Sequence, residues 1–300
     1  MFRLYGDYMN KAVLIVGVLT YDSGKTTIAE ALATEAVSRG VYVGISKPVS
    51  SYNIWYQHDF FEESIKLGIL VGEDVVRLHR AAKSREPMEV EGPVVGALAP
   101  PDPEALDWRI SLYTDISSSV ISQTILLRIT RCLSTGKIRT IHFIIQENLD
   151  RCIEPLKPLV NDFLKSIEYT VETIEVRELT EILESKAPEY ADECLNHVCR
   201  EHELTIIESY NDVASPTRMS LLKPQVVVAV APGKAAIYRG DMYRKAIEVL
   251  GEQIEPWRLN TRRVISILKP IETVKVEVKG RRDKETREEL FDKILKNIEG

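Results

Sequence analysis

Short apolar runs rich in valine and isoleucine recur along the chain and alternate with longer segments in which apolar residues return every three or four positions. A continuous apolar run of this length is typical of a strand buried on both faces, and the longer period is typical of a helix. The runs at 12–18, 41–46 and 226–231 are the clearest strands. Further strands or extended segments are predicted at 94–98, 140–145, 170–176, 204–207, 264–268 and 274–278.

The first helix is predicted at 25–39, where Ile28, Leu32 and Ala36 follow one another at helical spacing. Gly40 stands where the end of a helix favours glycine. The other predicted helices are 60–70, 75–82, 117–133, 154–167, 179–201 with an interruption at Pro188, 243–250 and 284–298.

Strands that alternate with helices favour an α/β protein with one mainly parallel sheet covered on both faces. A length of 300 residues allows one large domain or two smaller ones. We interpret 1–300 as a single domain, within which 110–200 is a large insertion.

The segment between the first predicted strand and the first predicted helix has the composition of a phosphate-binding loop. Backbone N–H groups of a tight loop, together with the positive end of the following helix, can hold the phosphates of an NTP. Gly24 would allow the backbone to approach the phosphates closely, and Lys25 would reach the β and γ phosphates. The hydroxyl of Thr26 would be one of the ligands of Mg²⁺. Leu19 stands where the usual pattern has its first glycine, so the alternative is a chance Gly-Lys-Thr at a helix start. The predicted nucleotide-binding residues are Thr20, Tyr21, Asp22, Ser23, Gly24, Lys25, Thr26 and Thr27.

Acidic residues near the ends of predicted elements are candidates for Mg²⁺, which takes one or two carboxylates besides phosphates and waters. Glu208 ends a buried apolar run, and we expect it to share one edge of the sheet with the phosphate loop. Its alternative is an ordinary acidic residue at the start of a loop. Asp74 is a second candidate, unless it only caps the following helix, and Asp59 is a third. We predict Thr26, Asp74 and Glu208 as the metal ligands.

Lys47 follows the second predicted strand and precedes Pro48. Proline favours an extended backbone at the residue before it, which is compatible with the end of a strand. The amine of Lys47 could therefore reach the phosphates or an anionic substrate, and the alternative is a surface lysine. We predict Lys25 and Lys47 as the catalytic residues.

The phosphate loop, the segment Lys47-Pro48-Val49-Ser50 and Glu208 after an apolar strand resemble dethiobiotin synthetase. That enzyme belongs to a group of P-loop proteins that includes the cobyrinate amidating synthases and the Min-type ATPases. The resemblance covers about 11–82 and 204–231 and implies a three-layer P-loop NTPase fold. The chain is also similar to uncharacterised archaeal proteins described as predicted P-loop ATPases or GTPases.

The resemblance implies that Lys47 lies at the active site and that Asp74 and Glu208 bind Mg²⁺. It implies chemistry in which ATP phosphorylates a carbamate, or a carboxylate in the amidating relatives, before an amine captures it. The stretch between Asp74 and Glu208 is much longer than in dethiobiotin synthetase, so the biotin-pathway substrate is not carried over. Thr20 stands where Min-type ATPases have an additional lysine, so a lysine from a second subunit is not expected. A homodimer follows from the family alone.

The formal net charge of −6 disfavours non-specific binding to nucleic acid. No apolar run approaches the ~20 residues of a membrane span, and residues 1–10 lack the regions of a signal peptide. We therefore expect a cytoplasmic protein with neither a nucleic acid nor a membrane as partner. Cys194 and Cys199 lie near His197 and His202, but their spacing fits none of the common zinc motifs. We interpret these residues as positions on a helix face.

The expected function is a Mg²⁺-dependent ATP-binding protein, either an ATPase or an ATP-dependent ligase acting on a small amine or carboxylate substrate. ATP is favoured over GTP because the chain has no Asn-Lys-x-Asp motif. The first alternative is a nucleotide-dependent switch, an ATPase or GTPase whose insertion binds a protein partner. The second is a P-loop fold that no longer binds nucleotide, as Leu19 suggests.

Overall fold

The computed structural model describes residues 11–251, 254–276 and 284–299 of the chain. The chain divides into two compact units, and each is described by itself. Both are α/β, and each contains a mixed sheet. Unit 1 comprises Met1–Pro48, Asp74–Glu91 and Asp192–Gly300, and unit 2 comprises Val49–Glu73 and Gly92–Ala191.

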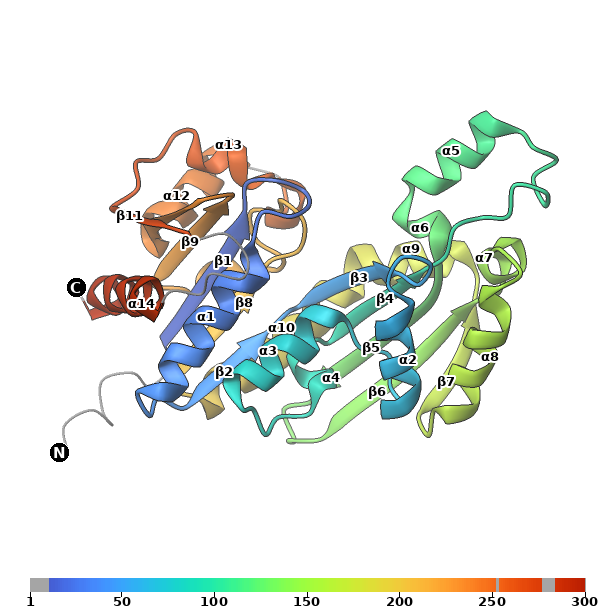
Figure 1. Ribbon diagram of the computed structural model, residues 1–300, viewed down its shortest axis with the longest axis horizontal. Helices are drawn as coiled ribbons and strands as arrows, with labels where there is room; N and C mark the ends of the chain where they lie inside the picture. Colours follow the sequence, from blue (N-terminus) through green and yellow to red (C-terminus); the bar gives the residue numbers. More distant parts are fainter. Residues whose placement is uncertain (1–10, 252–253, 277–283, 300) are drawn as a thin grey trace. The chain divides into compact units, whose positions relative to one another are not determined.

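The described part of unit 1 holds a six-stranded sheet in the order β11-β10-β9-β1-β8-β2 (Figure 1). The strands β2, β8, β1 and β9 are parallel, and β10 and β11 add antiparallel pairs at one edge. Their bounds are β1 Lys11–Gly17, β2 Val43–Ser46, β8 Leu204–Glu208, β9 Val226–Ala231, β10 Lys234–Arg239 and β11 Glu272–Lys275.

Helices cover both faces of this sheet. Their bounds are α1 Lys25–Ser38, α3 Glu73–Ala82, α4 Met88–Glu91, α10 Ala187–Glu201, α11 Arg218–Leu222, α12 Gly240–Leu250, α13 Thr261–Ile265 and α14 Lys284–Glu299. Successive side chains of a strand point to opposite faces. On β1, Val13 and Ile15 therefore pack with α1, α3 and α14, whereas Leu14 and Val16 pack with α10, α12 and α13. This two-sided burial explains why β1 is apolar at successive positions.

Unit 2 holds a five-stranded sheet among its described residues, in the order β3-β4-β5-β6-β7. The outer pairs β3/β4 and β6/β7 are parallel, and β4, β5 and β6 are antiparallel. The bounds are β3 Val49–Asn53, β4 Val94–Leu98, β5 Thr124–Cys132, β6 Ile138–Ile145 and β7 Thr170–Ile174.

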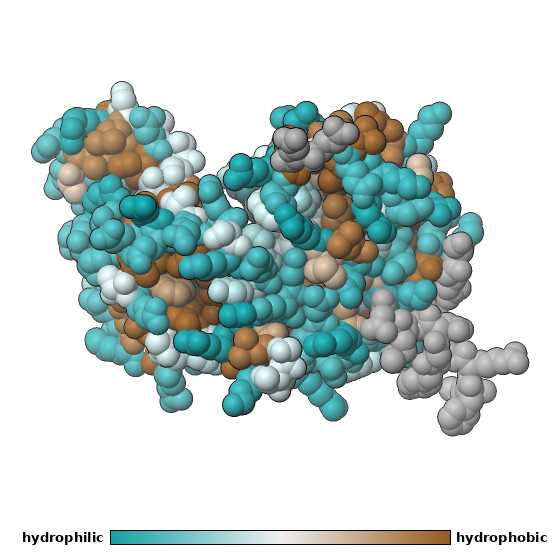
Figure 2. Space-filling model, turned by 180° about the vertical axis from the view of Figure 1, so that it is seen from behind, coloured by the Kyte–Doolittle hydropathy of each residue, from teal (hydrophilic) through white to brown (hydrophobic). Residues whose placement is uncertain are grey.

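The helices of unit 2 are α2 His58–Leu67, α5 Ile110–Ser118, α6 Val120–Gln123, α7 Gln146–Arg151, α8 Leu156–Ser166 and α9 Val176–Glu181, with a π-helical turn at Ile182–Lys186. On one face of the sheet, α2 and α8 pack through Phe61 and Phe163. On the other face, Leu179 of α9 belongs to the core. The segment around α5 exposes Trp108 and Ile110, and Figure 2 shows apolar residues gathered on it.

Several predicted elements are confirmed, namely the strands at 12–18, 41–46, 94–98, 140–145, 170–176, 204–207 and 226–231 and the helices at 25–39, 60–70, 75–82, 154–167, 243–250 and 284–298, each within a few residues of its observed bounds. The helix at 179–201 is confirmed with a π-helical turn just before Pro188. The strand at 274–278 corresponds to β11, and its last two residues, like 1–10, lie outside the described residues. Of the range 110–200, residues up to Ala191 belong to unit 2 and the rest to unit 1.

The α/β class is confirmed, but the prediction of one mainly parallel sheet holds only in part, because the described residues form two sheets and both are mixed. In unit 1 the antiparallel pairing begins at β10, which follows β9 through a tight turn at Pro232 and Gly233. Gly233 has a positive φ of 78°, a conformation that glycine adopts without strain. The hydrophobic pattern of the sequence does not predict β3 or β10.

Two elements were assigned the wrong type. The helix predicted at 117–133 is largely the strand β5, which is β-branched at Thr124, Ile125, Ile129 and Thr130 and pairs on both sides. The strand predicted at 264–268 is instead the end of helix α13, whose Val264 is buried against α12. Both apolar runs are short, and periodicity alone does not separate a buried strand from a buried helix.

No helix among the described residues is long and apolar enough to cross a lipid bilayer.

Candidate functional site

The loop between β1 and α1 turns sharply before the helix begins. Gly24, the residue before α1, has a left-handed backbone with φ of 90°, and Asp22 also has a positive φ of 54°. Gly24 makes no side-chain capping hydrogen bond, so the first N–H groups of α1 are available to an anion. Thr20 and Tyr21 are exposed, whereas Ser23 and Lys25 are buried at the base of the loop.

Gly17, the last residue of β1, makes room for this loop. A Cβ atom at this position would lie 2.5 Å from Ser23 Oγ and 2.9 Å from Lys25 Nζ. A larger residue at this position would therefore displace the ends of the Ser23 and Lys25 side chains from where they lie over the end of the strand. The sequence shows a glycine at this position, two residues before Leu19, but it does not indicate which contacts depend on that glycine.

Lys25 is held by the turn that follows β8. Its Nζ donates to the main-chain oxygen of Asn211 at 2.8 Å and to Ser23 Oγ at 3.3 Å. Asn211 has a positive φ of 45°, which turns the chain back at this point. Burial, followed by the charge of Lys47, lowers the pKa of Lys25.

Thr26, Lys47, Asp74 and Glu208 form one group, called here the Lys47 cluster. Lys47 Nζ donates to Glu208 Oε1 and to Asp74 Oδ2, both at 2.8 Å, and to the main-chain oxygen of Ser209 at 3.2 Å. Thr26 Oγ1 lies 2.9 Å from Asp74 Oδ1 and 2.8 Å from Glu208 Oε1. Lys47 is only 3% exposed, so it is not a surface lysine.

The parallel strands bring these residues together. Glu208 ends β8 and lies opposite Ile15 of β1, two residues before the end of that strand. Lys47 follows β2, the neighbour of β8 on its other side. Asp74 lies in the first turn of α3, whose Leu78 packs into the core with α1. The expected common edge for Glu208 and the phosphate loop is therefore present.

The charges of the cluster depend on one another. Burial by itself would lower the pKa of Lys47, but the carboxylates of Asp74 and Glu208 outweigh it and raise that pKa. Burial raises the pKa of Asp74, and the charge of Lys47 outweighs this and lowers it. Burial keeps the pKa of Glu208 raised in spite of Lys47. The ammonium group of Lys47 is thus the counter-ion of two carboxyl groups.

One oxygen of the cluster is buried without a hydrogen-bond partner. Glu208 Oε1 lies near Lys47 and Thr26, whereas Glu208 Oε2 has no hydrogen-bond partner among the described residues. Burying such an acceptor costs about 1–3 kcal/mol, more when it carries charge.

No protein-family model, curated protein or solved structure matches the chain.

Thr26, Asp74 and Glu208 supply oxygen ligands, which are of the kind that Mg²⁺ takes in proteins. Within the part of the chain that the structure describes, no group of three or more His, Cys, Asp and Glu residues could hold a metal ion. Mg²⁺ is usually bound through one or two carboxylates, with phosphate oxygens and waters as its other ligands. A hydroxyl and two carboxylates, one of which has the unpartnered oxygen, match that donor set.

Several other candidate ligands lie elsewhere. Asp59 belongs to unit 2, where its exposed carboxylate lies 3.1 Å from His58 Nε2. The residues considered for zinc also have other neighbours: Cys194 and Cys199 are buried in α10, His197 lies 3.2 Å from a Glu86 oxygen, and His202 stacks on Tyr42.

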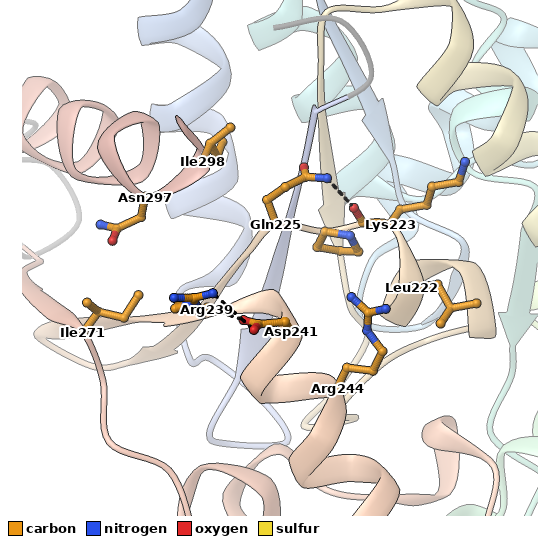
Figure 3. Close-up of a pocket in the computed structure, with 10 residues that line it drawn as sticks. Leu222, Lys223, Gln225, Arg239, Asp241, Arg244, Ile271, Asn297 and Ile298 are labelled. Carbon is orange, nitrogen blue, oxygen red and sulfur yellow. Dashed lines mark hydrogen bonds and ion pairs between the residues drawn. The ribbon is translucent and has the colours of Figure 1, made fainter. Parts of the chain in front are cut away.

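Unit 1 also has a pocket of about 400 Å³ near the amino ends of the parallel strands (Figure 3). Gln225, which lines it, precedes β9 and accepts a hydrogen bond from the main chain of Ala12 near the start of β1. The guanidinium of Arg239 in this pocket pairs with the carboxylate of Asp241. The pocket therefore lies at the end of the parallel strands that is remote from the phosphate loop.

Proposed function

We propose that the protein binds ATP with Mg²⁺ at the loop between β1 and α1, as a P-loop NTPase related to dethiobiotin synthetase. Its activity would be that of an ATPase or of an ATP-dependent ligase acting on a small amine or carboxylate substrate. The observation that carries this proposal is the Lys47 cluster, in which a threonine next to Lys25 meets two carboxylates and a second lysine.

The loop supplies the groups that a triphosphate needs. The free N–H groups at the start of α1 and the ammonium of Lys25 would bind the phosphate oxygens. Thr26, Asp74 and Glu208 would hold Mg²⁺, which neutralises charge on the phosphates when it is bound.

Lys47 is the candidate for orienting the second substrate. Its ammonium group is charged and fixed by Asp74 and Glu208, so it offers a positive charge at a defined position. Catalysis in phosphoryl transfer rests mainly on such positioning and on electrostatic stabilisation. An anionic acceptor, a carbamate or carboxylate, is the class of substrate that this charge would favour.

Calorimetric titration of the full chain with ATP, in excess Mg²⁺ and again in EDTA, tests the nucleotide site. Lys25→Ala removes a hydrogen bond between charged groups, worth about 1.5–3 kcal/mol, so it should weaken binding about 10- to 150-fold. Lys245→Ala, on the exposed side of α12, is the matched control and should bind like the wild type.

Absence of ATP binding by the wild-type chain would refute the proposal, and so would equal affinity in wild type and Lys25→Ala. The same titration with GTP tests the preference for ATP. A panel of amine and carboxylate compounds then tests the ligase activity, because the correct acceptor should increase ATP hydrolysis above its basal rate.

A nucleotide-dependent switch is the second candidate, and the contact between Lys25 and Asn211 favours it. Lys25 must leave this main-chain oxygen to reach a phosphate, so binding would release the turn after β8. Hydrogen exchange at residues 209–213 should then increase when nucleotide binds. Unchanged exchange in this turn would count against the switch.

A further inference from the structure

Arg77 of α3 and Glu30 of α1 form a two-pronged ion pair. Arg77 Nε lies 2.9 Å from Glu30 Oε1, and Arg77 Nη2 lies 2.6 Å from Glu30 Oε2. The side chains are 23% and 14% exposed, so water screens the pair only in part. Two parallel N–H···O bonds fix both distance and direction, which a single contact does not.

The pair repeats a contact of the Lys47 cluster one helical turn further on. Glu30 comes four residues after Thr26 in α1, and Arg77 comes three residues after Asp74 in α3. Residues at these spacings lie on the same face of a helix. The contacts Thr26–Asp74 and Glu30–Arg77 are therefore two successive links between the same two helices.

Apolar packing also joins α3 to α1, but it does not by itself fix the position of α3 along α1. Leu78 and Ala82 bury α3 against a core that includes Ala29 and Ala33 of α1. Such packing is non-directional, so it fixes the position of one helix along another less sharply than a hydrogen bond does. A fork between guanidinium and carboxylate does not tolerate small shifts, because both of its hydrogen bonds would lengthen together.

We propose that the Glu30–Arg77 pair positions Asp74 against Thr26, so that both oxygens face the same Mg²⁺ ion. The inference rests on the proposed function, since it assigns two positioning residues to the same nucleotide site. Arg77 and Glu30 touch neither the phosphates nor the metal. They act through the helix that carries Asp74, and the charge of Arg77 also helps to lower the pKa of that carboxyl group.

The test is the Mg²⁺ dependence of ATP binding in Arg77→Gln and Glu30→Gln. Outer partners of metal ligands typically contribute 10–100-fold to metal affinity, so the Mg²⁺ concentration for half-maximal binding should rise about tenfold. ATP affinity in EDTA should change less than about twofold, because these residues do not contact the phosphates. The double variant should show a smaller shift than the sum of the two single variants, since both break the same ion pair.

Two further variants separate positioning from general stability. Arg39→Gln breaks the ion pairs with Glu35 and Asp292 and the contact with the Phe291 ring near the other end of α1, and it should leave the Mg²⁺ dependence unchanged. Arg77→Lys keeps the charge but loses the fork, so it should give an intermediate shift. This variant also carries the test if Arg77→Gln does not fold.

A wild-type Mg²⁺ dependence in the Arg77 variants would overturn the inference and leave the proposed function intact. Equal loss of ATP binding with and without Mg²⁺ would also overturn it, because that loss indicates a purely structural role. Failure of the wild-type chain to bind ATP in the presence of Mg²⁺ would instead refute the proposed function, and this inference with it.

Discussion

Replacing Lys47 by methionine removes the positive charge of the Lys47 cluster but keeps a flexible side chain of similar length. Asp74 and Glu208 would then lie beside each other without a counter-ion. Breaking a buried ion pair by removing one partner costs about 3–5 kcal/mol. Asp74 is one-third exposed and can regain water, so we expect the lower end, about 3 kcal/mol.

The loss should depend on pH in a defined direction. Without Lys47, the pKa of Glu208, which burial already raises, rises further above its value in the unfolded chain. A carboxyl group of this kind favours the folded state at low pH, and its contribution is lost as the pH rises through the folded pKa. The deficit of Lys47→Met relative to wild type should therefore be smaller at about pH 5.5 than at about pH 8.

Urea-induced unfolding in EDTA measures both effects, and Lys245→Met provides the same substitution on the exposed side of α12. The control should change the free energy of unfolding by less than about 0.5 kcal/mol. A deficit below about 1 kcal/mol in Lys47→Met, or one that is equal at both pH values, would refute the assignment of Lys47 as counter-ion.

Two other substitutions test contacts elsewhere in the chain. Gly17→Ala places a Cβ atom 2.5 Å from Ser23 Oγ, so it should displace Lys25 and weaken ATP binding about tenfold by calorimetry. Gly96→Ala, whose Cβ atom would meet nothing closer than 3.6 Å, is its control, and unchanged affinity in Gly17→Ala would contradict the argument. Arg128→Met in unit 2 removes the donor to the main-chain oxygens of Leu70 and Gly92. At about 1–3 kcal/mol for each unsatisfied acceptor, this variant should lower the unfolding free energy by about 2 kcal/mol or more. ATP affinity should not change in that variant, and a chain of wild-type stability would show that Arg128 is dispensable.

The elements predicted correctly are those in which one periodicity dominates. The apolar run of β1 and the amphipathic pattern of α14 are of this kind. β5 is different, because its inward side chains include the buried Arg128 and its apolar residues also fit a helix. Its identity as a strand comes from pairing with β4 and β6, and such partners are not visible in a local pattern.

The candidate site was predictable as a set of residues but not as an arrangement. Lysine, threonine and carboxylates at the ends of strands and the starts of helices are sufficient to select Lys25, Thr26, Lys47, Asp74 and Glu208. That Lys47 lies between the two carboxylates depends on β8 being between β1 and β2 in the sheet, which the order along the chain does not indicate. The contact of Lys25 with Asn211 involves a main-chain oxygen, so no residue type indicates it.

The ion pair between Lys47 and Asp74 also joins the two ends of a long segment of the chain. The chain leaves unit 1 directly after Pro48 and returns to it at Asp74, so residues 49–73 begin and end beside this pair. A divalent ion that competed with Lys47 for the carboxylate of Asp74 would weaken the ion pair that joins the two ends of this segment. The charge that balances the carboxylates therefore also holds together the two ends of residues 49–73.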